Sequence, residues 1–190
     1  MTSPPAAPTM QAVALLERAI DYTRVALTSV RADLLDAPTP CSGWDLRALL
    51  EHMDDALAAF TEAADLGTVD LRPLATQPEA HRLVESLRLR ACSALGAWSA
   101  QPGALPLAIG DARLDAGVLA AAGALEITVH GWDVAQTCGL DHPIPDSLAE
   151  PLLDVAVDLV ADADRPARFG HRRPVESGGR GEALLAFLGR

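Results

Sequence analysis

The 190-residue sequence contains no lysine, so all 15 of its basic residues are arginine. There are 26 acidic residues, which give a formal net charge of −11 and an isoelectric point near 4.7. An acidic chain without basic clusters repels the phosphates of nucleic acids and anionic membrane surfaces. We therefore expect neither a nucleic acid nor a membrane as a partner.

Cysteine is also scarce, because Cys41, Cys92 and Cys138 are the only three and they form no CxxC pair. Three widely spaced cysteines are not a disulfide framework and are typical of the reducing cytoplasm. Residues 1–5 have no basic region followed by an apolar block, so we expect no signal peptide. The longest uncharged helical run, residues 116–125, is too short to cross a bilayer. Together these absences predict a cytoplasmic protein.

Glycine-rich phosphate loops and nucleophile elbows are absent as well, so the sequence does not identify the substrate. Apolar side chains at helical spacing are abundant: hydrophobic residues make up 49 % of the chain, enough for one domain over residues 1–190 with a sizeable core. Apolar residues that recur every three or four positions, with proline and glycine between the runs, predict five helices. They cover residues 10–36, 45–65, 79–100, 115–139 and 146–163.

The remaining segments complete the predicted fold. Residues 1–9 are expected to be frayed, and residues 105–114 are expected to be extended with a short hairpin around Gly110 and Asp111. Residues 165–181 read as a loop, and residues 182–188 as a terminal apolar turn. The sequence thus predicts an all-α, up-and-down four-helix bundle with one long connection, and residues 140–190 as an additional C-terminal helix and tail.

A candidate metal site lies in the predicted helix 115–139. Glu126 and His130 are four residues apart, which places them on one helix face, and Asp133 lies about one turn further on. A carboxylate and a neutral imidazole so placed can share a divalent cation, but two ligands rarely hold a metal. His52, on the shoulder of the apolar stripe of the helix 45–65, is the candidate third ligand. Three protein ligands leave a coordination position open, as catalytic sites do.

Ordinary structural roles compete with this interpretation. A Glu–His pair at this spacing is more often a surface pair, and His52 alone is more often a half-buried polar residue. Asp133 either orients an imidazole, acts as a general base or is a surface carboxylate. Cys41 and Cys138 are at least two turns from the proposed ligands, so we expect them to be inert. The arginines of the loop, Arg165, Arg168, Arg172 and Arg173, either hold an anionic ligand or form a solvated surface.

Two motifs carry a resemblance to a known family. Residues 39–52, TPCSGWDLRALLEH, resemble the opening signature of the mycothiol-dependent maleylpyruvate isomerase N-terminal domain family, which belongs to the DinB-like superfamily of metal-binding four-helix bundles. Residues 126–135, EITVHGWDVA, followed by Thr137-Cys138-Gly139, are similar to its second signature. The tail at 184–190, LLAFLGR, is similar to the ending of short actinobacterial members. The resemblance covers residues 10–190.

This resemblance implies a DinB-like fold in which His52, Glu126 and His130 hold a divalent metal. Zn²⁺ is the usual ion, Ni²⁺, Fe²⁺ and Co²⁺ are alternatives, and water is a further ligand. Trp44 and Trp132 match aromatic positions that pack the site. Characterised relatives use the metal to activate mycothiol, or another low-molecular-weight thiol, in isomerisation or S-transfer. The isomerase proper carries an additional C-terminal domain, whereas about fifty residues follow the helix 115–139 here, so the resemblance supports the metal site more than the isomerase reaction.

Three hypotheses about function follow. The first is a metal-dependent thiol transferase or isomerase in which the cation lowers the pKa of a thiol that attacks an electrophilic small molecule, with Asp133 orienting a ligand or acting as a base. The second is a non-catalytic metal-binding or small-molecule-sequestering bundle. The third is a bundle without a metal. The expected partners are a small-molecule substrate and a low-molecular-weight thiol such as mycothiol, and the oligomeric state is open between monomer and homodimer.

Overall fold

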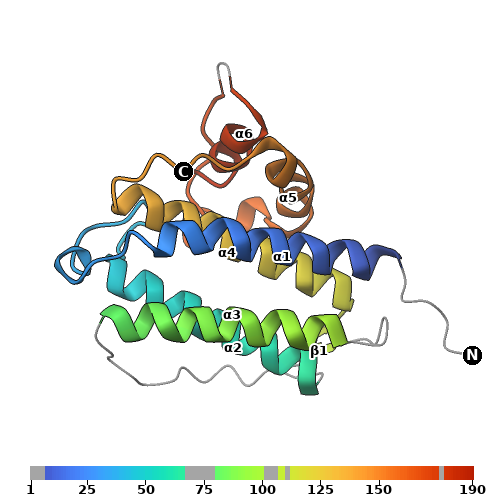
Figure 1. Ribbon diagram of the computed structural model, residues 1–190. Coiled ribbons are helices and arrows are strands. Elements are labelled where there is room, and N and C mark those ends of the chain that lie inside the picture. The colour runs from blue at the N-terminus through green and yellow to red at the C-terminus, as the bar shows by residue number, and fades with distance from the viewer. Residues whose placement is uncertain (1–6, 67–79, 101–106, 110–111, 176–177) are drawn as a thin grey trace, which may run out of the picture.

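The computed structural model describes residues 7–66, 80–100, 107–109, 112–175 and 178–190 (Figure 1). Helices account for most of these residues, and within them no helix combines the length and the apolarity that crossing a bilayer requires. The elements are α1 (Ala7–Leu27), a 3₁₀ turn (Ala32–Leu34), α2 (Leu46–Leu66), α3 (Ala80–Ala100), β1 (Leu107–Ile109), β2 (Ala112–Leu114), α4 (Ala116–Thr137), α5 (Asp146–Leu159), a second 3₁₀ turn (Asp162–Asp164) and α6 (Arg180–Phe187).

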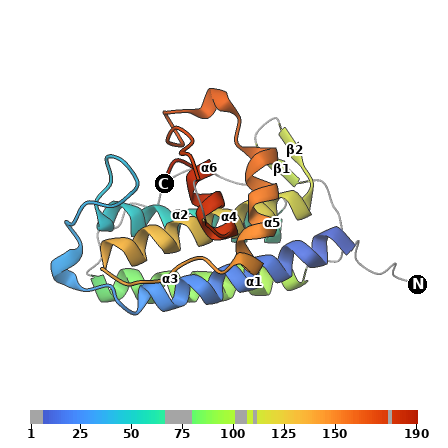
Figure 2. The same ribbon diagram turned by 90° about the horizontal axis from the view of Figure 1, so that it is seen from above.

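Four of the helices form a bundle of two layers. Helices α1 and α4 pack closely along their lengths in one layer, and α2 and α3 form the other, with α2 against α4 and α3 against α1 (Figure 1). Helix α5 covers the outer face of the α1–α4 layer and α6 packs on α5 (Figures 1 and 2). The strands β1 and β2 pair antiparallel, with Leu107 opposite Leu114. The predicted all-α bundle with an additional C-terminal helix is confirmed, as is the short hairpin.

The helix directions differ from the predicted alternation. Helices α2 and α3 run the same way, and so do α1 and α4, so the order of directions is up, down, down, up (Figure 1). The predicted loop at 66–78 falls almost wholly on residues 67–79, which lie outside the described residues. A connection of that length can reach about 40 Å when extended, more than the roughly 32 Å length of a 21-residue helix. Its length therefore permits a parallel pair, whereas a short loop would have forced an antiparallel one.

Two carboxylates begin the helices that carry the candidate site. Asp45 Oδ1 accepts a hydrogen bond from the Ala48 amide at 2.8 Å, and Asp115 Oδ1 accepts one from the Gly117 amide at 2.8 Å. Each satisfies an amide of the first turn and favours the positive end of the helix. Gly139, at φ +69°, follows the end of α4 in the left-handed conformation that glycine adopts without strain. The starts predicted for α2 and α4 are confirmed.

The prediction for the first helix is wrong at both ends. The helix begins at Ala7, so residues 7–9 are helical rather than frayed, and Pro8 sits in the first turn, where its missing N–H costs nothing; residues 1–6 lie outside the described residues. The helix ends at Leu27 rather than near Asp36. The Thr28 and Ser29 amides bond to the Val25 and Ala26 carbonyls at three-residue spacing, which is typical of the last turn of a helix.

Helices α1 and α4 approach each other tightly one residue from the candidate site. Thr23 Oγ1 donates to the carbonyl of Ile127 at 2.7 Å in the buried interface. Gly131, on the next turn of α4, has no side chain, and a methyl group there would overlap the Thr23 hydroxyl. Glycine at this position therefore lets α1 support the segment of α4 that carries His130.

We expect Gly131→Ala to destabilise the protein by about 1–3 kcal/mol, because the added methyl group must displace Thr23. For a domain of this size that lowers the melting temperature by roughly 3–10 °C, measurable by circular dichroism. The matched control is Gly96→Ala on an exposed position of α3, where an added Cβ meets no atom within 4 Å. That substitution should raise stability by up to about 1 kcal/mol. An unchanged melting temperature for Gly131→Ala would contradict the close approach.

Candidate metal centre

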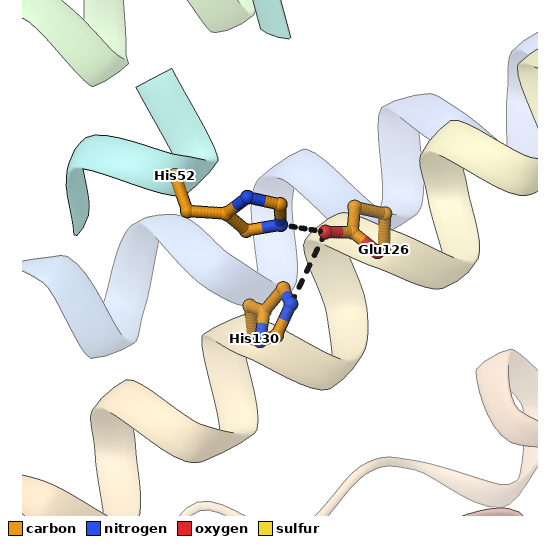
Figure 3. Close-up of side chains that lie close together, drawn as sticks. All are labelled: His52, Glu126 and His130. Atoms are coloured by element: carbon orange, nitrogen blue, oxygen red, sulfur yellow. Dashed lines mark hydrogen bonds and ion pairs between the residues drawn. The ribbon is translucent and has the colours of Figure 1, made fainter. Parts of the chain in front are cut away.

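Three side chains from α2 and α4 converge on one point (Figure 3). His52 lies in the second turn of α2, and Glu126 and His130 lie on consecutive turns of α4, which passes antiparallel beside it. Glu126 Oε1 is 2.6 Å from His52 Nε2 and 3.1 Å from His130 Nε2. One ligand atom from each of the three residues lies within 4.8 Å of the other two. The structure therefore brings together the three residues that sequence reasoning selected from two distant segments.

The donor atoms fit a divalent transition metal. Two imidazole nitrogens and one carboxylate oxygen are ligands that Zn²⁺ and its neighbours accept, at about 2.0–2.2 Å from the ion, which places the ligands of a tetrahedral ion roughly 3.3–3.6 Å apart. The observed separations of 2.6 and 3.1 Å are hydrogen-bond contacts, so the three side chains must move apart slightly to hold an ion. The side chains of His52 and Glu126 are 39 % and 31 % exposed, so one side of the group stays open to water or a small molecule.

The buried carboxylate of Asp133 lies beside His130 and is bonded by both His130 and Arg190. Asp133 is fully buried, and its Oδ2 lies 2.9 Å from His130 Nδ1. Arg190 binds the same carboxylate through two parallel hydrogen bonds, which we call the fork: Nε donates to Oδ1 and Nη2 donates to Oδ2, each at 2.9 Å. Asp133 is thus not a surface carboxylate, and both of its oxygens are engaged. Its position favours orienting the His130 ring over accepting a proton from a substrate.

Charges in the group shift the pKa values of its members in opposite directions. Burial acts to lower the pKa of His130, but the Glu126 carboxylate, together with the hydrogen bonds to Asp133 and Glu126, outweighs it and raises the pKa to about 9. Burial acts to raise the pKa of Glu126, but the two imidazoles hold it well below its usual range. Without a metal, His130 is therefore a cation at neutral pH, and a metal must displace its proton.

The aromatic ring of Trp44 lies along one side of the His–Glu–His group. The indole of Trp44 lies 4.6 Å from the His52 ring and 6.1 Å from the His130 ring between centroids. The resemblance placed Trp44 at the site, and the structure does the same. Trp132, the second aromatic of the motifs, packs partly buried against the hydrophobic core instead. Trp44 thus limits the approach to the two imidazoles to the open side.

Cys41 lies closer to this group than spacing along the helices predicted. Burial raises the pKa of its thiol, Asp133 and Glu126 raise it further, and the neighbouring Arg190 opposes the shift. The loop between α1 and α2 brings the thiol toward the end of the chain, which counting helical turns could not anticipate. The raised pKa keeps the thiol protonated at neutral pH, which agrees with its predicted inertness.

Sequence reasoning missed Arg190 and left the loop arginines open. Arg190 is 57 residues from Asp133, and no spacing or composition signal links the two. Among the loop arginines, the guanidinium groups of Arg165 and Arg172 lie 5.1 and 4.6 Å from the centre of the Phe187 ring. Arg172 also pairs with Asp162 at 2.8 Å. These two arginines fasten the loop to α6 rather than facing the candidate metal centre.

Fold and site together define a helical bundle with a His–Glu–His group between two of its helices. The chain belongs to the mycothiol maleylpyruvate isomerase N-terminal domain family, which it matches over residues 16–135. This confirms the resemblance of its two motifs, and all three converging residues lie within the match. Two uncharacterized proteins of Mycobacterium tuberculosis, Rv0738 and MT0763, are 28 % identical over 181 residues, which cover 92 % of this chain and 94 % of each of them. No solved structure matches the chain significantly.

Proposed function

We propose that this protein is a divalent-metal-dependent enzyme that activates a low-molecular-weight thiol of the mycothiol type for transfer to, or isomerisation of, an electrophilic small molecule. The observation that carries the proposal is the convergence of His52 Nε2, Glu126 Oε1 and His130 Nε2 on one point with an open side. Membership of a family described by mycothiol and maleylpyruvate isomerase supports a thiol as the second reactant.

Each side chain has a separate task in this proposal. His52, Glu126 and His130 hold the ion through two neutral nitrogens and one negative oxygen, with Zn²⁺ the expected metal. A bound divalent ion supplies Lewis acidity that lowers the pKa of a coordinated thiol toward neutrality. Asp133 accepts a hydrogen bond from the Nδ1–H of His130, and this leaves Nε2 as the nitrogen that binds the ion. Trp44 closes one side and keeps water from it.

Elemental analysis of protein purified without a histidine tag tests the metal. We expect about one divalent ion per chain, because three donor atoms meet at one point. His52→Ala and His130→Ala should abolish the ion, since each leaves only two protein ligands. The control His171→Ala, on an exposed loop, should keep it. Wild-type protein that purifies metal-free and cannot be reloaded with Zn²⁺ would overturn the proposal.

Calorimetric titration of the metal-loaded protein with mycothiol, glutathione and cysteine tests the thiol. We expect at least one of these thiols to bind the loaded wild type and not the metal-free protein, because the ion is the proposed anchor for sulfur. Metal binding without any thiol binding would overturn the enzymatic proposal in favour of a non-catalytic metal-binding bundle.

A further inference from the structure

We propose that Arg190 is a positioning residue of the metal centre, which holds the Asp133 carboxylate in the orientation that directs His130 toward the ion. The inference rests on the metal-binding function proposed above. It assigns a role to a residue outside the family match at 16–135 and outside the three ligands.

The geometry of the contact is the first argument. Nε and Nη2 of Arg190 bond the two oxygens of Asp133 at equal distances of 2.9 Å, which is the bidentate arrangement that a planar guanidinium makes with a carboxylate. The Asp133 side chain is 0 % exposed and that of Arg190 only 9 %, so water does not compete for the pair. Because Oδ2 of Asp133 also meets His130 Nδ1 at 2.9 Å, the fork fixes the carboxylate that fixes the ring.

The protonation state of a ligating histidine is the second argument. When Nε2 of His130 binds a metal, the neutral ring keeps its one proton on Nδ1, and Asp133 must remain a charged acceptor for it. Without Arg190, a fully buried carboxylate would retain a single imidazole as its partner, and an under-compensated buried charge is costly. It would relieve that cost by turning away from its buried position. That movement removes the acceptor that orients His130.

The backbone around Arg190 is held independently of its side chain, which makes the position suitable for substitution. The Arg190 amide donates to the Leu185 carbonyl at 2.8 Å, and the Leu188 amide donates to that of Leu184 at 3.1 Å. Gly189 takes a left-handed φ of +79° and lies so close to Gly170 that any side chain there would collide. A change of the Arg190 side chain therefore leaves the tail on α6 and removes the two bonds to Asp133 together with the interaction with the Cys41 thiol.

The experiment is a double-mutant cycle on Zn²⁺ affinity, measured by chelator competition on folded, metal-free protein. We expect Arg190→Gln to weaken Zn²⁺ binding by about 10–100-fold, as losing an outer partner of a ligating histidine does. Arg190→Lys should recover part of the affinity, because lysine keeps the charge but lacks the fork. Since Arg190 acts through Asp133, the double variant Asp133→Asn/Arg190→Gln should bind no more weakly than Asp133→Asn alone.

Arg180→Gln is the matched control, an arginine on α6 that is 56 % exposed and pairs with Glu150 at the surface. It should bind Zn²⁺ as the wild type does. Two results would overturn the inference: wild-type Zn²⁺ affinity in Arg190→Gln, whether or not its melting temperature falls, or additive losses of affinity in the double variant. If Arg190→Gln fails to fold, Arg190→Lys alone decides, and wild-type affinity in that variant overturns the role. Failure of the wild type to bind Zn²⁺ is a different outcome, which overturns the proposed function instead.

Discussion

Replacing Glu126 with glutamine is expected to weaken Zn²⁺ binding by more than about 100-fold while leaving the bundle folded. Glutamine has nearly the same shape and can still accept hydrogen bonds from His52 and His130, but it brings no negative charge to the ion. Loss of an outer partner alone costs 10–100-fold in affinity, so loss of the only anionic ligand among the three must cost more. Chelator competition on the metal-free variant measures this directly.

The same substitution separates a metal centre from a structural ion pair. If the group binds a metal, excess Zn²⁺ at about 1,000 times the dissociation constant stabilises the wild type by roughly 4 kcal/mol and raises its melting temperature by about 8–16 °C. That rise should fall to about a third or less in Glu126→Gln, because a loss of about 100-fold leaves Zn²⁺ at only about 10 times the dissociation constant. It should persist in Glu85→Gln, a control on an exposed position of α3. If the group were only an ion pair, Zn²⁺ would not change the melting temperature of the wild type or of Glu126→Gln. A Zn²⁺ affinity of Glu126→Gln within about threefold of the wild type would exclude Glu126 as a ligand.

Local patterns were sufficient to predict most of the fold. The caps at Asp45 and Asp115 and the glycine after α4 mark helix ends through contacts within one turn, so they can be read from neighbouring residues. The direction of α3 relative to α2 could not be read from neighbouring residues, because it depends on the path of the long connection between the two helices. The first helix was predicted too long because apolar spacing continued through residues 28–36, whereas the backbone leaves α-helical spacing at Thr28.

The three converging side chains of the candidate site could be predicted from the sequence. Glu126 and His130 share a helix face by their spacing, and the motif around His52 supplied the third. What lies behind them was not predictable, since Arg190 reaches Asp133 only because α5 and α6 fold back over the α1–α4 layer (Figure 2). Contacts of this kind are set by tertiary packing and leave no periodic signal in the sequence.

The metal should remove the fall of stability with rising pH that His130 causes. In the metal-free protein His130 has a pKa of about 9, above its value of 6.5 in an unfolded chain, so the stability it contributes is fully present below about pH 6.5 and is lost as the pH rises through 9. The size of that loss is at most about 3 kcal/mol. Glu126 has a lowered pKa, so the stability it contributes is present above the pKa of 4.5 that it has in an unfolded chain. It is lost as the pH falls below that value toward the lower pKa of the folded state.

With Zn²⁺ bound this fall should disappear. The ion displaces the His130 proton, so its apparent affinity rises about tenfold for each pH unit between 6.5 and 9, and this gain offsets the loss of stability of the metal-free state. Urea unfolding at intervals across this range, with chelator and with Zn²⁺, gives both curves. We expect the metal-free curve to fall toward pH 9 and the Zn²⁺ curve to stay level. The fall should disappear in His130→Gln and remain in His171→Gln, whose imidazole is exposed on a loop. If the stability of the metal-free wild type were flat from pH 6.5 to 9, Glu126 would not hold a proton on His130. If the curves with chelator and with Zn²⁺ were parallel, the ion would not displace that proton.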